Sequence, residues 1–212
     1  MKARVTCGLL VAVLLFASLA VAQRRRGFGG GGYERPAEYA HLEDFDGGFQ
    51  FCRLVFRQSP AGDGAGWNVD WPRADMNLST RLAEITRTHI TMDDGVPKTE
   101  LINPGMVDEM AKCPFIMMTE PGTAYFTPEE AKNLREYLLR GGFLWADDFW
   151  GPDAWDFFEN SLRQVLPSSS YPIVDLPRDH TIFHQVLDAS TVPQIPGIGY
   201  WDGRNATNER GP

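Results

Sequence analysis

One segment, TPEEAKNLREYLLRGGFLWADDFWG starting at Thr127, limits what this chain can fold into more than any other part of its sequence. Thr127 is suited to cap a helix, Pro128 to occupy the first helical position, and Glu130 to complete a capping box. The paired glycines that start at Gly141 then stop the helix. The apolar residues 143–146 predict a short buried strand directly after it.

Two carboxylates, Asp147 and Asp148, follow this predicted strand. Ligands of open α/β sheets bind outside the carboxyl ends of the strands, which makes both residues candidates for a site. Adjacent side chains on a regular strand point to opposite faces, so the two converge only if the backbone turns after Asp147. They could then bind a hard cation through oxygen, or one could act as a general base. The alternative is that one caps the next turn and the other is solvated.

The rest of the chain alternates predicted strands with predicted helices. Further strands are expected at 49–56, 114–119 and 171–176, and further helices after Asn103-Pro104 and from Asp153. Another helix is expected to begin after Asp75 or Asn77, with Leu78, Leu82 and Ile85 on one face. This alternation predicts a layered α/β fold, with a mostly parallel sheet flanked by helices in the flavodoxin-like manner.

Four motifs occur in order along the chain. They are Gly66-Trp67 with Asp70 and Pro72, the GGFLWADDFWG run, Asp179-His180-Thr181-Ile182-Phe183-His184, and Val192-Pro193-Gln194-Ile195-Pro196-Gly197. Together they resemble the bacterial domain-of-unknown-function family 4159 from Phe49 to about Arg210. The spacing of strand, helix, Gly-Gly and strand resembles, more broadly, the class I glutamine amidotransferase-like superfamily, including its trehalose-utilisation-type branch.

The chain departs from this superfamily at the position that matters most for chemistry. In amidotransferases the strand after the helix delivers a nucleophilic cysteine, and the matching residue here is Asp147. Glutaminase activity is therefore not expected. Relatives in the closer family also continue past the point where this chain stops, at Pro212. The resemblance is thus compatible with a fold truncated at its carboxyl end, lacking an edge strand and part of any site.

The amino-terminal end predicts export. Residues 1–22 have a basic start, an apolar stretch and the small-x-small pattern of Ala20-Val21-Ala22, as in a cleaved signal peptide. An uncleaved anchor is the alternative, but the apolar stretch is short for a membrane span. Residues 23–48 are rich in glycine and arginine and predict a flexible leader, followed by a single α/β domain over 49–212. We expect a periplasmic or secreted protein that is not an integral membrane protein after cleavage.

The net charge and the cysteines give information on binding partners and on a possible disulfide. The formal net charge of −8 at pH 7 argues against nucleic-acid binding, which needs a basic face. Cys52 and Cys113 remain after cleavage, and an oxidising compartment would permit a disulfide between them. Two buried, inert thiols would fit the sequence equally well, and the distance between the two Cα atoms decides.

Two histidines and a tryptophan-rich loop complete the candidate residues. His180 and His184 are spaced i, i+4, and with Asp147 they would form a metal site of a known type. The alternative is a short turn capped by Asp179, with His180 bonded to the backbone. Ligand-binding candidates are Trp67, Asp70, Trp71, Arg73 and Trp150, since tryptophans beside carboxylates suit sugar-like ligands. Tryptophans also commonly fill a core or an interface.

The favoured hypothesis is an exported cell-envelope protein that binds a small molecule or an envelope protein partner without catalysing a reaction. The alternative is a metal-dependent or acid/base hydrolase that uses Asp147 or Asp148 with His180 or His184. The sequence indicates no cofactor, apart from a divalent metal under this alternative.

Overall fold

The computed structural model describes residues 37–189. The predicted signal peptide, the first part of the predicted leader and the Val192–Gly197 motif lie outside these residues. No helix in the described range is long and apolar enough to cross a membrane.

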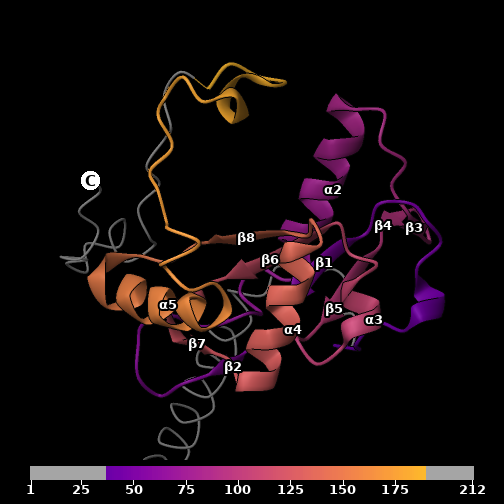
Figure 1. Cartoon of the computed structure of the whole chain (residues 1–212). Helices are drawn as coiled ribbons and strands as arrows, with labels where there is room; N and C mark the ends of the chain where they lie inside the picture. The colour runs from indigo at the N-terminus through magenta and orange to yellow at the C-terminus, as the bar shows by residue number, and fades with distance from the viewer. Residues whose placement is uncertain (1–36, 190–212) are drawn as a thin grey trace, which may run out of the picture. The chain divides into compact units, whose positions relative to one another are not determined.

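A parallel sheet of four strands forms the centre of the described domain (Figure 1). Its strands are β1 (Phe51–Leu54), β5 (Thr99–Ile102), β6 (Phe115–Thr119) and β8 (Phe143–Asp147). Their order is β5-β1-β6-β8, and every neighbouring pair is parallel. The predicted layered α/β class is therefore confirmed. Two small antiparallel pairs accompany the sheet, β2 (Arg57–Gln58) with β7 (Ala124–Tyr125) and β3 (Met92–Asp93) with β4 (Val96–Pro97).

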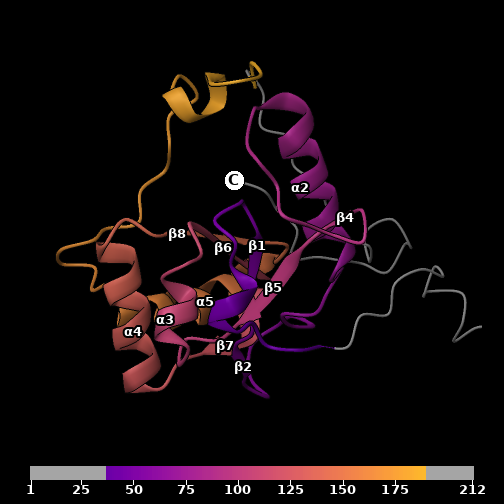
Figure 2. The same cartoon turned by 90° about the vertical axis from the view of Figure 1, so that its right-hand side faces the viewer.

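Helices cover the two faces of the sheet unequally. The α-helices are α2 (Arg73–Ile85), α3 (Val107–Met110), α4 (Pro128–Leu139) and α5 (Gly151–Val165), and the 3-10 helices are η1 (Leu42–Asp44), η2 (Pro121–Thr123) and η3 (Thr181–His184). Figure 2 shows α3, α4 and α5 on one side of the strands and α2 on the other. The main core lies on the first side, where Cys52, Leu54, Ile116 and Met118 pack with α4 and α5.

The segment that begins at Thr127 folds as its sequence predicts. The Thr127 hydroxyl accepts a hydrogen bond from the Glu130 amide at 3.2 Å, and the Glu130 carboxylate accepts one from the Thr127 amide at 2.8 Å. Tyr137 then ties the helix to the sheet, because its hydroxyl donates to the carbonyl of Cys113 and accepts from the amide of Phe143. A side chain at Gly142 would overlap the Tyr137 ring, which explains the second glycine of the pair.

The helix α2 differs from the prediction in its start and its buried face. It begins at Arg73 rather than after Asp75 or Asn77, and it buries Asp75 and Ser79. The side chains of Leu78 and Ile85, predicted to point inward, are 41% and 43% exposed. The prediction was wrong because it weighed only apolar spacing. The residue that orients this helix is an arginine on β1.

That arginine, Arg53, is fully buried and lies on the face of β1 opposite the main core. Its Nε lies 3.0 and 3.1 Å from the two carboxylate oxygens of Asp75, and its Nη2 also bonds Asp75. Its Nη1 donates to the carbonyls of Trp67 at 3.0 Å and Val69 at 3.1 Å. One side chain thus fixes both α2 and the loop that precedes it.

Packed structure begins before Phe49, the predicted start of the domain. Ala40 is only 2% exposed, and its amide donates to the carbonyl of Leu101 on β5 at 2.9 Å. The carboxyl-terminal part of the predicted leader therefore packs along this edge of the sheet. At the other end, Tyr171–Leu176 forms no strand, although its sequence predicts one.

Cys52 and Cys113 form a disulfide, with their Cα atoms 6.0 Å apart. The disulfide joins the middle of β1 to the turn before β6. Of the two alternatives left open by the sequence, a disulfide or two buried inert thiols, the structure has the disulfide.

We expect Asp75→Ala to lower the free energy of unfolding by about 3–5 kcal/mol, because it leaves the Arg53 charge buried and uncompensated. Urea unfolding of the purified protein measures this loss. Glu84→Ala is the matched control, since it removes an exposed ion pair with Arg81 on the same helix and should cost about 0.5 kcal/mol. Similar losses in the two variants would contradict the special role of the buried pair.

The double variant Cys52→Ala/Cys113→Ala should be about 4 kcal/mol less stable than the oxidised chain, because the cross-link closes a loop with a sequence separation of 61. Urea unfolding with and without a reductant tests this. The reductant should destabilise the natural chain and leave the double variant unchanged. Equal unfolding midpoints for the two oxidised proteins would refute the expectation.

Candidate functional site

The strand order places a topological switch point at the carboxyl ends of β1 and β6. The chain leaves β1 toward β5 on one side, and it leaves β6 toward β8 on the other. Neighbouring strands whose connections diverge in this way mark the usual ligand-binding position of an open α/β sheet. The loop after β1, the turn after β6 and the turn after β8 all reach this edge. We call it the carboxyl edge.

Four acidic residues from these three connections influence one another at the carboxyl edge. Asp70 comes from the loop after β1, Glu120 from the turn after β6, and Asp147 and Asp148 from the end of β8. The charges of Asp70 and Asp148 both raise the pKa of Glu120, and the charge of Asp70 also raises the pKa values of Asp147 and Asp148. The Glu120 amide also donates to the Asp147 carbonyl at 3.0 Å, which joins the turn after β6 to the end of β8.

The backbone at this edge is strained at three of these residues. Asp70, Glu120 and Asp148 have φ angles of 58°, 46° and 60°, in the left-handed region that few residues other than glycine adopt. Strained backbone tends to gather at functional sites, where the surrounding structure holds it in place. At Asp148 the conformation also supplies the turn that the sequence required if the two adjacent aspartates were to converge.

Burial is the main reason why the pKa values of Glu120, Asp147 and Asp148 are raised. It raises the pKa of Asp147 to about 6, with a further increase from the charge of Asp148, against a hydrogen bond from Trp145 and the charge of Arg53. Burial also raises the pKa of Asp148 and the pKa of Glu120. Arg53 cannot neutralise all of them, because Asp75 already occupies two of its donors.

Two buried polar atoms at this edge have no hydrogen-bond partner among the described residues. They are Oδ1 of Asp147 and the indole Nε1 of Trp71. Buried polar atoms in folded proteins are nearly always bonded, so unpaired ones point to a missing partner such as water or a ligand. The Asp147 oxygen is the stronger indication, because it can accept from a donor and also carries charge.

The loop that carries Trp67 and Trp71, which we call the tryptophan loop, precedes α2 and is hydrogen-bonded to the buried Arg53. Arg53 bonds the backbone of Trp67, and the rings of Trp67 and Trp71 meet edge to face with centroids 6.1 Å apart. Both rings are partly buried. Two further candidates lie at helix starts, Arg73 at the beginning of α2 and Trp150 at the cap of α5.

The structure does not bring the two candidate histidines together with the aspartates. His180 caps η3, and its Nδ1 accepts from the Ile182 amide at 3.2 Å. His184 contacts Asp188 at 2.7 Å and the carbonyl of Arg178 at 3.0 Å. Within residues 37–189 no three His, Cys, Asp or Glu side chains are arranged to hold a metal ion. The set of Asp147, His180 and His184 is therefore not assembled here.

Sequence reasoning missed two participants, Glu120 and Arg53. Glu120 directly follows the predicted strand at 114–119, so the rule that selected Asp147 would also have selected it. Arg53 interrupts an apolar strand, and a charge in such a place indicates a buried partner. Neither signal identifies the partner residue.

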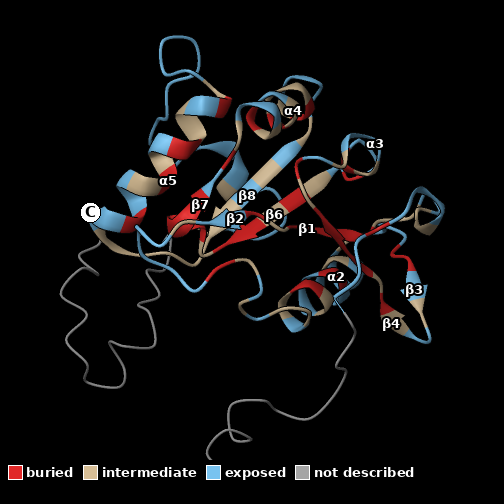
Figure 3. Ribbon diagram, turned by 90° about the horizontal axis from the view of Figure 1, so that it is seen from below, coloured by how far each residue is buried: buried red, intermediate tan, exposed pale blue. Residues whose placement is uncertain are grey.

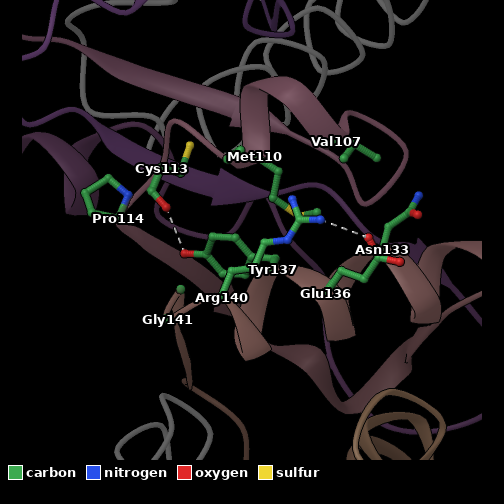
Figure 4. Close-up of a pocket in the computed structure, with 11 residues that line it drawn as sticks. Val107, Met110, Cys113, Pro114, Asn133, Glu136, Tyr137, Arg140 and Gly141 are labelled. Carbon is green, nitrogen blue, oxygen red and sulfur yellow. Dashed lines mark hydrogen bonds and ion pairs between the residues drawn. The ribbon is translucent and has the colours of Figure 1, made fainter.

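A separate cavity of about 260 Å³ lies between α3 and α4, near the start of β6 (Figure 4). Its polar side chains are already paired. Tyr137 bonds the carbonyl of Cys113, Asn133 bonds the carbonyl of Pro104, and Arg140 meets Glu136 at 3.7 Å. This arrangement explains the cavity as a gap between packed helices.

Fold and site together define a layered α/β protein with a group of acidic residues at the carboxyl edge of its sheet. The chain belongs to the family of the domain of unknown function DUF4159, whose sequence model matches residues 51–211. The family resemblance drawn from the four motifs is thereby confirmed. A comparison with curated proteins finds no match.

Asp147→Asn should stabilise the fold above about pH 6 and have little effect near pH 4. The pKa of Asp147 is raised by folding, so its contribution to stability is present at low pH and is lost as the pH rises through about 6. Thermal unfolding of both proteins across this range measures the effect, which we expect to be on the order of 1 kcal/mol at neutral pH, after allowance for solvent screening. A stability difference that does not vary with pH would argue against a buried, hard-to-ionise Asp147.

Proposed function

We propose that this chain is an exported cell-envelope protein whose α/β domain binds a positively charged group of a small molecule or partner protein at the carboxyl edge. The observation that carries the proposal is the place of Asp70, Glu120, Asp147 and Asp148 at the divergence point of the sheet, where the Glu120 amide donates to the Asp147 carbonyl at 3.0 Å and a buried Asp147 oxygen lacks a partner among the described residues.

Charge determines the kind of ligand. The carboxylates repel one another, and Arg53, whose charge lowers the pKa values of Asp147 and Asp148, is committed to Asp75. A ligand that brings an ammonium or guanidinium group would relieve this repulsion and could donate to the free oxygen of Asp147. The rings of Trp67 and Trp71 add aromatic surface that also favours a cation. A bare metal ion fits less well, because the described side chains form no chelating group of three.

Export is supported by two features that do not depend on each other. The amino-terminal residues have the pattern of a signal peptide, and the domain contains a disulfide, which persists in oxidising compartments.

A non-catalytic role is supported by the residue at the end of β8. If the domain is related to class I glutamine amidotransferases, as the spacing of its helix, glycines and strand suggests, Asp147 stands where they carry the nucleophilic cysteine. A carboxylate there serves recognition rather than glutaminase chemistry. The alternative of a hydrolase using His180 or His184 gains no support from the contacts of these histidines, which lie within their own segment.

Agmatine, a small molecule with one guanidinium and one ammonium group, is a suitable probe. Calorimetric titration of the mature chain at low ionic strength should show binding that weakens about tenfold in Asp148→Asn and in Glu120→Gln. Asp108→Asn, in the short helix α3, is the matched control for general surface charge and should bind as the natural chain does. Equal weakening in all three variants would reject a specific site. Binding of neutral N-acetylglucosamine in place of agmatine would reject the charged ligand.

A further inference from the structure

Among residues 37–189, the strand β8 is a free edge of the sheet, and the aromatic side chains on one of its faces are exposed. Phe143 and Trp145 are 48% and 45% exposed, whereas every residue of β1 is buried (Figure 3). The same face carries Phe115 of β6, whose ring stacks on Phe143 with centroids 5.8 Å apart and meets Trp145 at 6.1 Å. Parallel sheets are normally covered on both faces. An aromatic surface beside an open strand edge therefore indicates a missing neighbour.

The segment that follows α5 has the complementary character. Its large apolar side chains are exposed: Tyr171, Ile173, Val174, Leu176, Ile182, Val186 and Leu187. Among the described residues, the hydrogen bonds found for residues 172–189 stay within this segment. The match to the family reaches residue 211, so the segment is part of the family's domain rather than a tail beyond it.

Chain topology predicts where such a segment should pair. The chain passes from β6 through α4 to β8, one position outward in the sheet, and α5 then packs beside α4 in the same core. A crossover of the usual right hand from β8 through α5 leads to a parallel position on the free side of β8. Tyr171–Leu176 is the first extended stretch after α5, and the connection over 166–170 has a common length. Its β-branched and aromatic residues also favour a strand.

We infer that Tyr171–Leu176 docks on the free edge of β8 as a fifth parallel strand, and that the apolar residues after it cover Phe143 and Trp145. This occupant is favoured over a second copy of the chain because it is tethered to the same domain by the short connection from α5. Tethering gives it a high effective concentration at this edge.

Docking would also extend the candidate site. The carboxyl ends of parallel strands meet at one edge, so Arg178, Asp179 and His180 would follow the new strand next to Asp147 and Asp148. This second step rests on the proposed function, whereas the docking itself does not. It would bring the candidate histidine and the carboxylates of the sequence hypothesis to the same edge.

Photo-crosslinking tests the docking directly. Replacement of Phe143 by p-benzoylphenylalanine keeps an aromatic ring on the uncovered face, and irradiation of the mature chain should link it to the tryptic peptide Gln164–Arg178. The same replacement of Tyr125, an exposed aromatic residue on β7, is the matched control and should give no such link. A link from residue 143 to a second copy of the chain, an equal link from both positions, or no link from residue 143 would overturn the inference.

Hydrogen exchange supplies an independent test. Ile173 is 40% exposed, so Ile173→Pro disturbs little packing in the undocked segment, but it removes a donor from a docked strand. Residue 173 is the position to change because Pro172 has no N–H, must therefore face away from β8, and leaves the N–H of its neighbour to face β8. Exchange of the β8 amides should become about tenfold faster in Ile173→Pro and stay unchanged in Ser168→Pro, in the connection. Unchanged exchange in Ile173→Pro would overturn the docking. If the cross-link forms but Asp148→Asn binds agmatine normally, the docking stands and the proposed function fails.

Discussion

The contact between Arg53 and Asp75 is the interaction on which the rest of the described structure depends. A fully buried guanidinium is tolerated only if it is paired and its remaining donors are bonded. Arg53 meets this condition with one carboxylate on α2 and two carbonyls in the loop after β1. The position of α2, which covers β1, and the position of the loop that carries Trp67 and Val69 both follow from this single buried charge.

The same constraint leaves the face of the sheet with α2 incompletely covered. An amphipathic helix would normally place its apolar stripe on the sheet, but α2 must direct Asp75 inward to reach Arg53. Leu78 and Ile85 are exposed as a consequence, and the aromatic residues of β6 and β8 are left to another part of the chain. On the opposite face, the disulfide and the Tyr137 hydroxyl join β1, α4 and the starts of β6 and β8.

What could be predicted from the sequence depended on how local the determining contact is. The helix α4 and the strand β8 were predictable, because the capping box, the glycine stop and the apolar strand are all encoded within one continuous segment. The buried face of α2 was not, since its determinant, Arg53, lies 22 residues before Asp75. Asp147 and Asp148 could be selected by their place at a strand end. Their association with Asp70 and Glu120 depends on strand order, which a single sequence does not display.

The carboxyl edge opposes stability in several ways at once, which is the strongest reason to regard it as a binding site. Like charges converge there, three acidic residues adopt a strained backbone, and a buried oxygen lacks a partner among the described residues. Each feature carries a free-energy cost, and stability alone would favour neutral or glycine residues at these positions. Local consistency is the rule in folded proteins, and departures from it gather where function requires them. A cationic ligand would offset the repulsion and satisfy the oxygen together, so one binding event would account for costs that have no structural benefit of their own.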